Sequence, residues 1–205
     1  MTATPGANPP FVSRGGLKLR HALDAFSLDP RGLDCADLGC STGGFTDCLL
    51  KAGARSVIAM DTGYGVLAYT LRTDPRVVVR ERENALHAPP PPEGVDLVVI
   101  DAGWTPQRLT IPAALRWLRT DERLATCRMI SLVKPHYENE PRARAFRGVL
   151  PDDVAATIAA ETIAALPGLG VRVLSETLSP VRGSSARASK AGNLEWLVLL
   201  APAAA

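Results

Sequence analysis

A glycine-rich segment, residues 34–44, holds the residues with the clearest chemical potential in this chain. It begins as a short apolar strand, passes through three glycines and two hydroxyl residues, and leads into residues 45–50, which have helical spacing. Glycines let a ligand approach the backbone closely, and the N–H groups at a helix N-terminus favour its polar or anionic part. The segment predicts a ligand-binding turn; a tight strand-to-helix connection without a ligand is the alternative.

Two acidic residues indicate which ligand this turn would hold. The next apolar strand, residues 56–60, ends in Asp61, about 20 residues after the turn, where an acid suits the hydroxyl groups of a ribose. Gly39 and Gly43 stand four apart and follow Asp37, so their order differs from the Gly-x-Gly-x-x-Gly of dinucleotide sites. Asp37 would repel a pyrophosphate and attract the sulfonium and ammonium charges of S-adenosyl-L-methionine. The spacing resembles the first motif of methyltransferases that use this cofactor.

The rest of the chain alternates apolar strands with helical segments, which predicts a parallel sheet covered by helices on both faces. The last two strands, with no helix expected between them, should pair antiparallel at one edge. The expected strands cover residues 34–38, 56–60, 77–79, 95–100, 129–133, 171–174 and 194–200. The expected helices cover residues 14–26, 45–50, 66–72, 106–118 and 153–166. The predicted fold class is therefore α/β, with a Rossmann-like, mostly parallel, seven-stranded sheet.

Length and composition favour one such domain. The chain has 205 residues, 46% of them apolar, which suits one core and is short for two domains of typical size. Residues 1–10 are expected to be a flexible lead-in and residues 11–205 a single catalytic domain. The sequence shows no apolar signal region and no uninterrupted run of about 18 apolar residues, so we expect a soluble, cytoplasmic protein.

The cysteines and the charged residues are less informative. The four cysteines (Cys35, Cys40, Cys48 and Cys127) show no Cys-x-x-Cys pairing and are expected to be buried, reduced thiols, so no metal site is predicted. A formal net charge of +2 is low for a strong nucleic-acid binder. Basic residues nevertheless cluster in two stretches, which could contact phosphates or form an ordinary solvated surface. The clusters are Arg142, Arg144 and Arg147, and Arg182, Arg187 and Lys190.

Five ordered motifs carry a wider resemblance. They are residues 11–19 (FVSRGGLKL), 37–47 (DLGCSTGGFTD), 61–65 (DTGYG), 71–77 (LRTDPRV) and 132–135 (LVKP). Together they resemble the TlyA or haemolysin-A-like family of FtsJ-related methyltransferases, which transfer a methyl group from S-adenosylmethionine to ribose 2′-hydroxyls of ribosomal RNA. The resemblance spans nearly the whole chain from Phe11 to Leu200. It implies a class I methyltransferase fold, S-adenosyl-L-methionine as cofactor and RNA as substrate.

The resemblance also implies a catalytic tetrad of Lys, Asp, Lys and Glu. Its members match Lys18 in Ser-Arg-Gly-Gly-x-Lys, Asp101 after the fourth strand, Lys134 in Val-Lys-Pro and Glu195 in Gly-Asn-x-Glu. Methyl transfer benefits when the hydroxyl shares or loses its proton while the oxygen is held in line. Lys134 is the predicted proton acceptor. To act near neutral pH it must lose its own proton, which burial and Lys18 favour and Asp101 opposes. A purely structural ion-pair network is the alternative.

The predicted cofactor site combines the glycine turn with the residues that follow the next strands. The turn should surround the methionine end, Asp61 the ribose, and Glu83 or Asn84 the adenine. The full predicted set is Asp37, Gly39, Ser41, Thr42, Gly43, Gly44, Phe45, Asp61, Thr62, Glu83, Asn84 and Asp101.

Two departures from the family pattern bear on the substrate. A small RNA-binding domain of the S4 type usually precedes the first motif, where this sequence has only ten residues. RNA would then be bound by a rim of the clustered arginines with Arg14 and Arg20, or through a second copy or a recruiting partner. Residues 102–104 (AGW) and 134–138 (KPHYE) also replace Val-Ser-Phe and Lys-Pro-Gln-Phe-Glu, although Trp104 could still stack on a base or pack over the cofactor.

Three functions are therefore open. The preferred one is ribose 2′-O-methylation of structured RNA. A methyltransferase of the same fold acting on a small molecule or another acceptor is favoured by the low net charge. The third is a non-catalytic RNA-binding or membrane-active protein, whose membrane version is disfavoured because no amphipathic basic helix is evident.

Overall fold

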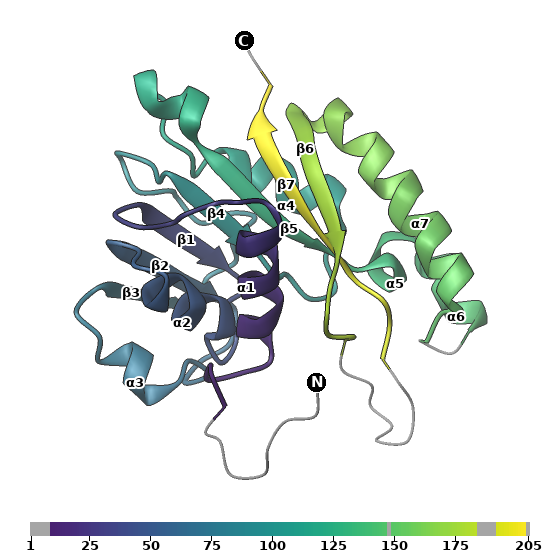
Figure 1. The fold of residues 1–205 in the computed structure, drawn as a ribbon, viewed down its shortest axis with the longest axis horizontal. Coiled ribbons are helices and arrows are strands. Elements are labelled where there is room, and N and C mark those ends of the chain that lie inside the picture. Colours follow the sequence, from purple (N-terminus) through teal and green to yellow (C-terminus); the bar gives the residue numbers. More distant parts are fainter. Residues whose placement is uncertain (1–8, 147–148, 184–191, 204–205) are drawn as a thin grey trace.

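A seven-stranded sheet forms the centre of the computed structural model, which describes residues 9–146, 149–183 and 192–203. The strand order is β3-β2-β1-β4-β5-β7-β6 (Figure 1). The strands are β1 (Asp34–Leu38), β2 (Ser56–Asp61), β3 (Val77–Glu81), β4 (Leu97–Ile100), β5 (Arg128–Val133), β6 (Val171–Leu178) and β7 (Trp196–Pro202). The seven predicted strands are all present.

The sheet is mostly parallel. Strands β1 to β5 pair in parallel, and β7 runs antiparallel to both of its neighbours, β5 and β6. The predicted antiparallel pairing at one edge is thus confirmed, and the reversed strand is the one next to the edge. The Rossmann-like fold class is confirmed as well.

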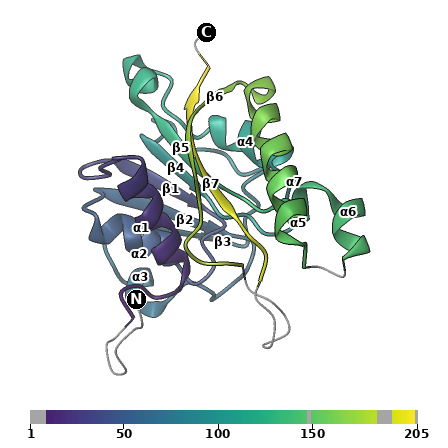
Figure 2. The same cartoon turned by 45° about the vertical axis from the view of Figure 1, so that its right-hand side comes forward.

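Helices cover both faces of this sheet (Figures 1 and 2). One face carries α1 (Gly15–Ala25), α2 (Gly44–Lys51) and α3 (Tyr69–Arg72), and the other carries α4 (Gln107–Leu115) and α7 (Asp152–Ala165). The remaining short elements are α5 (Pro135–Glu138), α6 (Glu140–Ala145) and the 3₁₀ turns η1 (Glu122–Thr126) and η2 (Leu166–Leu169).

Alternate residues of the central strands supply the two sides of the core. Leu97 and Val99 of β4 pack into the apolar cluster beneath α1 and α2, whereas Val98 and Ile100 pack into the cluster beneath α4. Both faces of β4 are therefore buried, which explains why its sequence is a continuous apolar run.

The strand register brings several strand ends to one edge of the sheet. Leu38 at the end of β1 pairs with Met60 on one side and Ile100 on the other, and Asp61 pairs with Glu81. The glycine turn, Asp61 and Asp101 consequently start from the same edge. This is the carboxyl edge of parallel strands, where open α/β sheets bind their ligands.

Two predicted helices are shorter than expected. The helix predicted over residues 66–72 begins only at Tyr69, because the Glu81 carboxylate accepts the backbone N–H groups of Gly65 and Val66 at 3.0 and 3.2 Å and holds that segment in another conformation. The helix predicted over residues 106–118 ends at Leu115. Beyond it, the chain forms a bridge to Val95 instead of a further helical turn.

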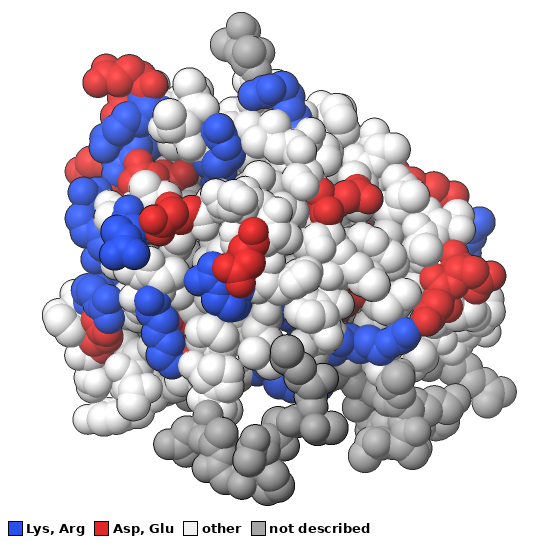
Figure 3. All heavy atoms as spheres, viewed as in Figure 1, with Lys and Arg blue, Asp and Glu red and all other residues white. Residues whose placement is uncertain are grey.

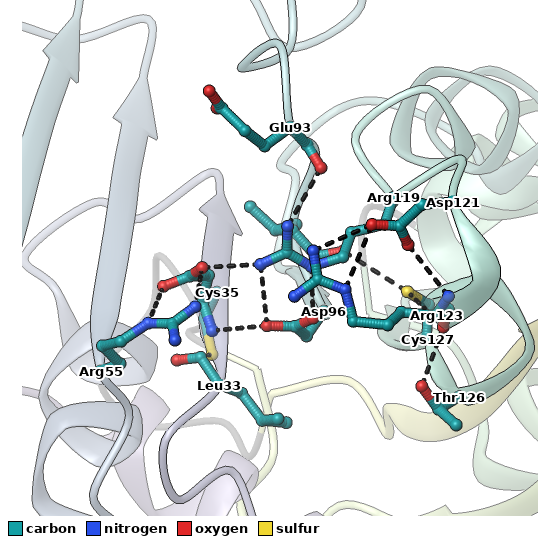
Figure 4. A network of polar contacts seen from close by, with 12 residues as sticks. Leu33, Cys35, Arg55, Glu93, Asp96, Arg119, Asp121, Arg123, Thr126 and Cys127 are labelled. Carbon is teal, nitrogen blue, oxygen red and sulfur yellow. Dashed lines mark hydrogen bonds and ion pairs between the residues drawn. The ribbon is translucent and has the colours of Figure 1, made fainter.

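A buried guanidinium lies at the amino ends of the parallel strands, opposite the edge that carries the glycine turn (Figure 4). Arg119, 3% exposed, contacts both carboxylate oxygens of Asp96 and donates to Asp34 Oδ2 at 2.7 Å and to the Glu93 carbonyl at 3.1 Å. Arg55 reaches Asp34 from the outer side. The hydrogen bond from Arg55 is the largest influence on Asp34 and, with the other donors, lowers its pKa to about 2 despite partial burial. We call Arg119, Asp34 and Asp96 the Arg119 network.

The sequence also predicted that the cysteine thiols are buried and that the chain has no apolar run long enough to span a membrane. All four cysteines are buried with free thiols, and burial raises the pKa of Cys48 to about 12. None of the helices in the described part of the chain is long and apolar enough to span a bilayer.

Candidate active site

Two adjoining cavities open at the carboxyl edge of the sheet. The larger has a volume of about 510 Å³ and the smaller about 230 Å³. Both are lined by Lys18, Gly39, Ser41 and Asp101, so the glycine turn and the end of β4 separate them.

Close packing explains two glycines of the turn. Gly39 has a positive φ of 93°, and a Cβ atom there would lie 2.8 Å from the carbonyl oxygen of Asp101. Only glycine lets the ends of β1 and β4 approach so closely. Gly43, with φ 98°, is the N-cap of α2, and a Cβ there would meet Leu71. Gly43 therefore shapes the turn and lines neither cavity.

Asp37 is buried beside the smaller cavity with one oxygen available. Its Oδ2 accepts the Thr46 N–H at 2.9 Å and the Thr46 hydroxyl at 2.6 Å, whereas Oδ1 has no hydrogen-bond partner among the described residues. Burial raises the pKa of Asp37 to about 7, although the Thr46 bonds act in the opposite direction. A cationic ligand group in this cavity would supply the missing partner.

Asp61 ties the end of β2 to the glycine turn. Its Oδ2 accepts the Ser41 N–H at 2.8 Å and its Oδ1 accepts the Gly63 N–H at 2.7 Å. It lines the larger cavity with Thr62, Glu83 and Asn84. These four predicted cofactor residues are thus brought together. Glu83 is also held by Arg80, and the Asn84 amide oxygen accepts the Leu86 N–H at 2.9 Å.

Three further residues of the predicted cofactor set lie around the smaller cavity. Thr42, Gly44 and Phe45 line it, and the Phe45 side chain also packs into the core cluster beneath α1. Gly44 lets the N-termini of α1 and α2 meet, because a Cβ there would lie 2.8 Å from the Gly16 nitrogen.

The four tetrad residues form two ion pairs in the larger cavity. Lys18 of α1 pairs with Glu195, and the two residues are 7% and 3% exposed. Lys134 Nζ lies 2.5 Å from Asp101 Oδ1 and donates to the Ala102 carbonyl at 3.3 Å. All four line the cavity, so residues far apart in sequence meet at one place.

The sequence left the balance between opposing influences on the Lys134 pKa open, and the geometry of the site indicates its direction. Burial alone would lower its pKa, but the attraction of Asp101, the hydrogen bond to it and the charge of Glu195 together raise the pKa above its ordinary value. The charges around Lys134, chiefly that of Asp101, thus raise its pKa by more than burial lowers it. Burial also raises the pKa of Glu195, although Lys18 and Lys134 oppose that shift. Lys134 is charged at neutral pH in this arrangement.

Aromatic side chains stand at the mouth of the larger cavity. Trp104 is 85% exposed, and its ring centroid lies 5.0 Å from that of Tyr137. The His136 ring is 4.0 Å from Tyr137. Burial, together with the charges of Lys134 and Lys18, lowers the pKa of His136 to about 4, so its imidazole is neutral at physiological pH. An exposed indole here suits stacking on a planar group.

Gly183 is a site residue that the sequence interpretation missed. It lines the larger cavity, and a Cβ there would lie 2.6 Å from Glu195 Oε1. A side chain would therefore displace the Glu195 carboxylate. Its N–H donates to the Asn193 carbonyl at 2.9 Å. No role was predicted for Gly183 from the sequence, in which the presence of a glycine was the available signal.

Only some residues of the predicted arginine rim belong to the described part of the chain. Arg20, Arg142 and Arg182 are each paired with an acid of this chain, and Arg14 lines the smaller cavity. Arg147, Arg187 and Lys190 lie outside the described residues. On the face in Figure 3, basic and acidic side chains lie beside one another.

Comparison with known proteins places this geometry in a family. Residues 11–184 match the family model described as FtsJ-like methyltransferase. The chain belongs to this family. The expected relationship to FtsJ-related methyltransferases is thereby confirmed.

Individual relatives agree with this assignment. The 16S/23S rRNA (cytidine-2′-O)-methyltransferase TlyA of Mycobacterium tuberculosis is 44% identical over 140 residues, which are 67% of this chain and 50% of that protein. Bacillus subtilis YqxC, provisionally named an rRNA methyltransferase, is 37% identical over 194 residues, 93% of this chain and 65% of YqxC. This chain therefore spans about half the length of TlyA.

A solved structure of a provisionally named hemolysin from Streptococcus thermophilus has the same fold as this chain. Its TM-score is 0.84 at 32% identity, and the match covers 97% of this chain and 69% of that one.

Proposed function

We propose that this chain uses S-adenosyl-L-methionine to methylate a ribose 2′-hydroxyl of structured RNA, most simply ribosomal RNA. The observation that carries the proposal is that the Lys18–Glu195 and Asp101–Lys134 ion pairs line the same cavity as Asp61. A relative named for cytidine-2′-O methylation of ribosomal RNA supports the choice of acceptor. An enzyme of this kind works in the cytoplasm, with the ribosomes.

The residues of both cavities fit the cofactor. The available Oδ1 of Asp37 suits a cationic amino group, and the glycine turn allows a close approach of backbone to ligand. Asp61 can accept ribose hydroxyls, because each carboxylate oxygen has room for a second hydrogen bond. Glu83 and Asn84 would hold the adenine. When bound, the cofactor supplies an electrophilic methyl group.

The tetrad would orient the acceptor hydroxyl and receive its proton. Asp101 and Glu195 hold the two lysines in place, and Lys134 Nζ takes the proton in the fraction of molecules in which it is neutral. At an ordinary lysine pKa of about 10.4, roughly one molecule in 10³ is neutral at pH 7.4. The raised pKa makes this fraction smaller in the ligand-free protein. Proton transfer to Lys134 should therefore become faster as the pH rises.

The cavity mouth and the arginines would contact the RNA. Trp104 is exposed where a base could stack on its indole. Surface ion pairs such as Arg142–Glu161 and Arg182–Asp152 are weak because water screens them, so a phosphate can replace the acid. A second copy of the chain or a recruiting partner could add further RNA contacts.

A second candidate is methylation of a small molecule or another acceptor. The observation in its favour is that Arg20, Arg142 and Arg182 are already paired with acids of this chain. A third reading, in which the tetrad is only a structural network, predicts binding without turnover.

Methyl transfer from radiolabelled S-adenosylmethionine separates these functions. The protein is incubated with total RNA, with and without ribonuclease, and compared with a small-molecule extract. We expect label in RNA that ribonuclease abolishes and Lys134→Ala lowers, with Arg123→Ala as a control on the opposite edge of the sheet. Label only in small molecules supports the second candidate. Cofactor binding without any transfer supports the third.

A further inference from the structure

A buried polar contact joins the start of α4 to α5 behind the active site. Gln107, the first residue of α4, is 4% exposed, and its backbone N–H donates to both carboxylate oxygens of Glu138 at 3.1 and 3.0 Å. The N-cap of α4 is Pro106, which makes no side-chain cap. Glu138, 31 residues away in sequence, therefore caps this helix in its place.

The Gln107 side chain anchors the same point to the sheet. Its Nε2 donates to the Leu132 carbonyl at 3.2 Å, and its Oε1 accepts the Ser131 hydroxyl at 2.6 Å. Both partners belong to β5, the strand that leads into Lys134. We call Gln107, Glu138 and Ser131 the Gln107 clamp.

The clamp lies at the end of the loop that supplies Asp101 of the tetrad. Residues 101–106 run from β4 to α4 and contain Asp101, which pairs with Lys134, and Ala102, whose carbonyl accepts from the same lysine. The loop also carries Trp104, which packs against Tyr137 of α5. These contacts face the larger cavity, whereas Glu138 lies outside its lining. The clamp supports the loop from behind.

The chemistry of Glu138 fits a structural acceptor. Burial raises its pKa to about 7, although the Gln107 N–H and Arg108 act in the opposite direction. Ionised or protonated, the group keeps an oxygen that can accept the single N–H of Gln107. Without Glu138 that buried N–H would lose its partner, which is more costly than never having formed the bond.

We propose that Glu138 is a positioning residue, which holds the 101–106 loop against α5 so that Asp101 stays paired with Lys134. Its catalytic consequence rests on the function proposed above. Glu138 acts through Gln107 and the loop, and does not contact the reacting atoms.

Hydrogen exchange tests the clamp without requiring activity. Glu138→Ala should accelerate amide exchange in residues 102–107, whereas Glu138→Gln, which keeps an acceptor oxygen at the same reach, should leave exchange close to that of the natural protein. Glu138→Asp keeps the charge but shortens the side chain and should behave like Glu138→Ala. Glu176→Ala, at an exposed position of β6, is the matched control. If Glu138→Ala does not fold, Glu138→Asp carries the same prediction.

Kinetics test the catalytic consequence. In Glu138→Ala, kcat should fall about 10-fold or more, because a misplacement of about 1 Å can cost about 10²-fold, and Glu138→Gln should restore most of it. The melting temperature should fall for Glu138→Ala but not for Glu138→Gln.

The outcomes separate this proposal from the proposed function. Unchanged exchange in residues 102–107 of both Glu138→Ala and Glu138→Asp overturns the clamp, whatever the activity. Faster exchange with unchanged kcat overturns the positioning role. If the natural protein transfers no methyl group, the proposed function fails, and the exchange experiment still decides whether the clamp exists.

Discussion

Lys18 in the first helix and Glu195, just before the last strand, form a buried ion pair although they are 177 positions apart in the sequence. The pair lies beside Asp101 and Lys134, so four charges share one cavity. Buried charges of this kind are costly unless each keeps its partner. This arrangement has separate consequences for stability and for turnover.

The first prediction separates those consequences. Lys18→Met should destabilise the protein by about 3–5 kcal/mol, because it leaves Glu195 buried without its main partner. The double variant Lys18→Met/Glu195→Leu should recover much of that stability in urea unfolding while methyl transfer stays low. A single Lys18→Met variant with full turnover would show that the pair is only structural.

The second prediction concerns the proton acceptor. Lys134→Ala should keep cofactor affinity and lose about 10² to 10⁴-fold in turnover, and Lys134→Arg should be nearly as impaired because arginine retains its proton. Since the pKa of Lys134 is raised, its neutral fraction grows with pH throughout the neutral and mildly alkaline range. The kcat of the natural protein should therefore rise across this range without a plateau near neutrality. Lys51→Ala, which removes a partly exposed lysine of α2, is the control. A flat profile would assign Lys134 an orienting role only.

The third prediction concerns the ribose end of the cofactor site. Asp61→Ala should weaken S-adenosylmethionine binding, measured by calorimetry, by about 1–3 kcal/mol, because it removes an acceptor and also releases the Ser41 N–H. Asp74→Ala, which removes an acid paired with Arg76, should leave the affinity unchanged. Equal affinities of the two variants would remove Asp61 from the site.

The fourth prediction concerns the arginine rim. If Arg142 and Arg182 contact phosphates, log affinity for RNA should fall linearly with log salt concentration, and each Ala variant should reduce the slope by roughly one unit. Arg128→Ala, which removes an arginine at the start of β5, should not change the slope. Salt-independent binding would favour the small-molecule acceptor.

The fifth prediction concerns the Arg119 network. Arg119→Met should cost about 3–5 kcal/mol, because it leaves Asp34 and Asp96 close together at the sheet edge. Arg123→Met, which breaks the exposed pair with Asp121, should change the stability much less, because water screens that pair. The measurement is urea unfolding of both variants.

Acid-induced unfolding tests the contacts of Asp34 independently. The folded-state pKa of Asp34 is lowered to about 2, below its unfolded value, so its contribution is complete above about pH 4 and is lost as the pH falls towards 2. The Arg55→Met variant, which removes the largest influence on this pKa, should lose less stability over that interval than the natural protein. An equal loss in both proteins would contradict this account.

The sequence predicted the sheet and the strand ends because both follow from local pattern. Apolar runs marked the strands, and parallel pairing placed Asp61 and Asp101 at one edge. That Lys18 and Glu195 belong to one tetrad was predicted only through the family resemblance, because no local pattern connects residues so far apart, and their direct pairing was not predicted.

Properties that depend on three-dimensional packing could not be predicted in this way. The balance between burial and Asp101 at Lys134 depends on distances that only the folded chain sets. The same holds for the Glu138 contact with Gln107 and for the shortening of α3 by Glu81.

The position of β7 between β5 and β6 has a consequence for synthesis of the chain. A ribosome makes β5 and β6 first, and β7, which pairs with both, emerges after them. Until then β5 has an open edge, and Lys18 has no Glu195 to neutralise it. A nascent or truncated chain that stops before Glu195 and β7 would therefore hold the residues of the glycine turn but lack a complete tetrad. Emergence of β7, rather than folding of the first half of the chain, sets the moment at which the four tetrad residues can first meet.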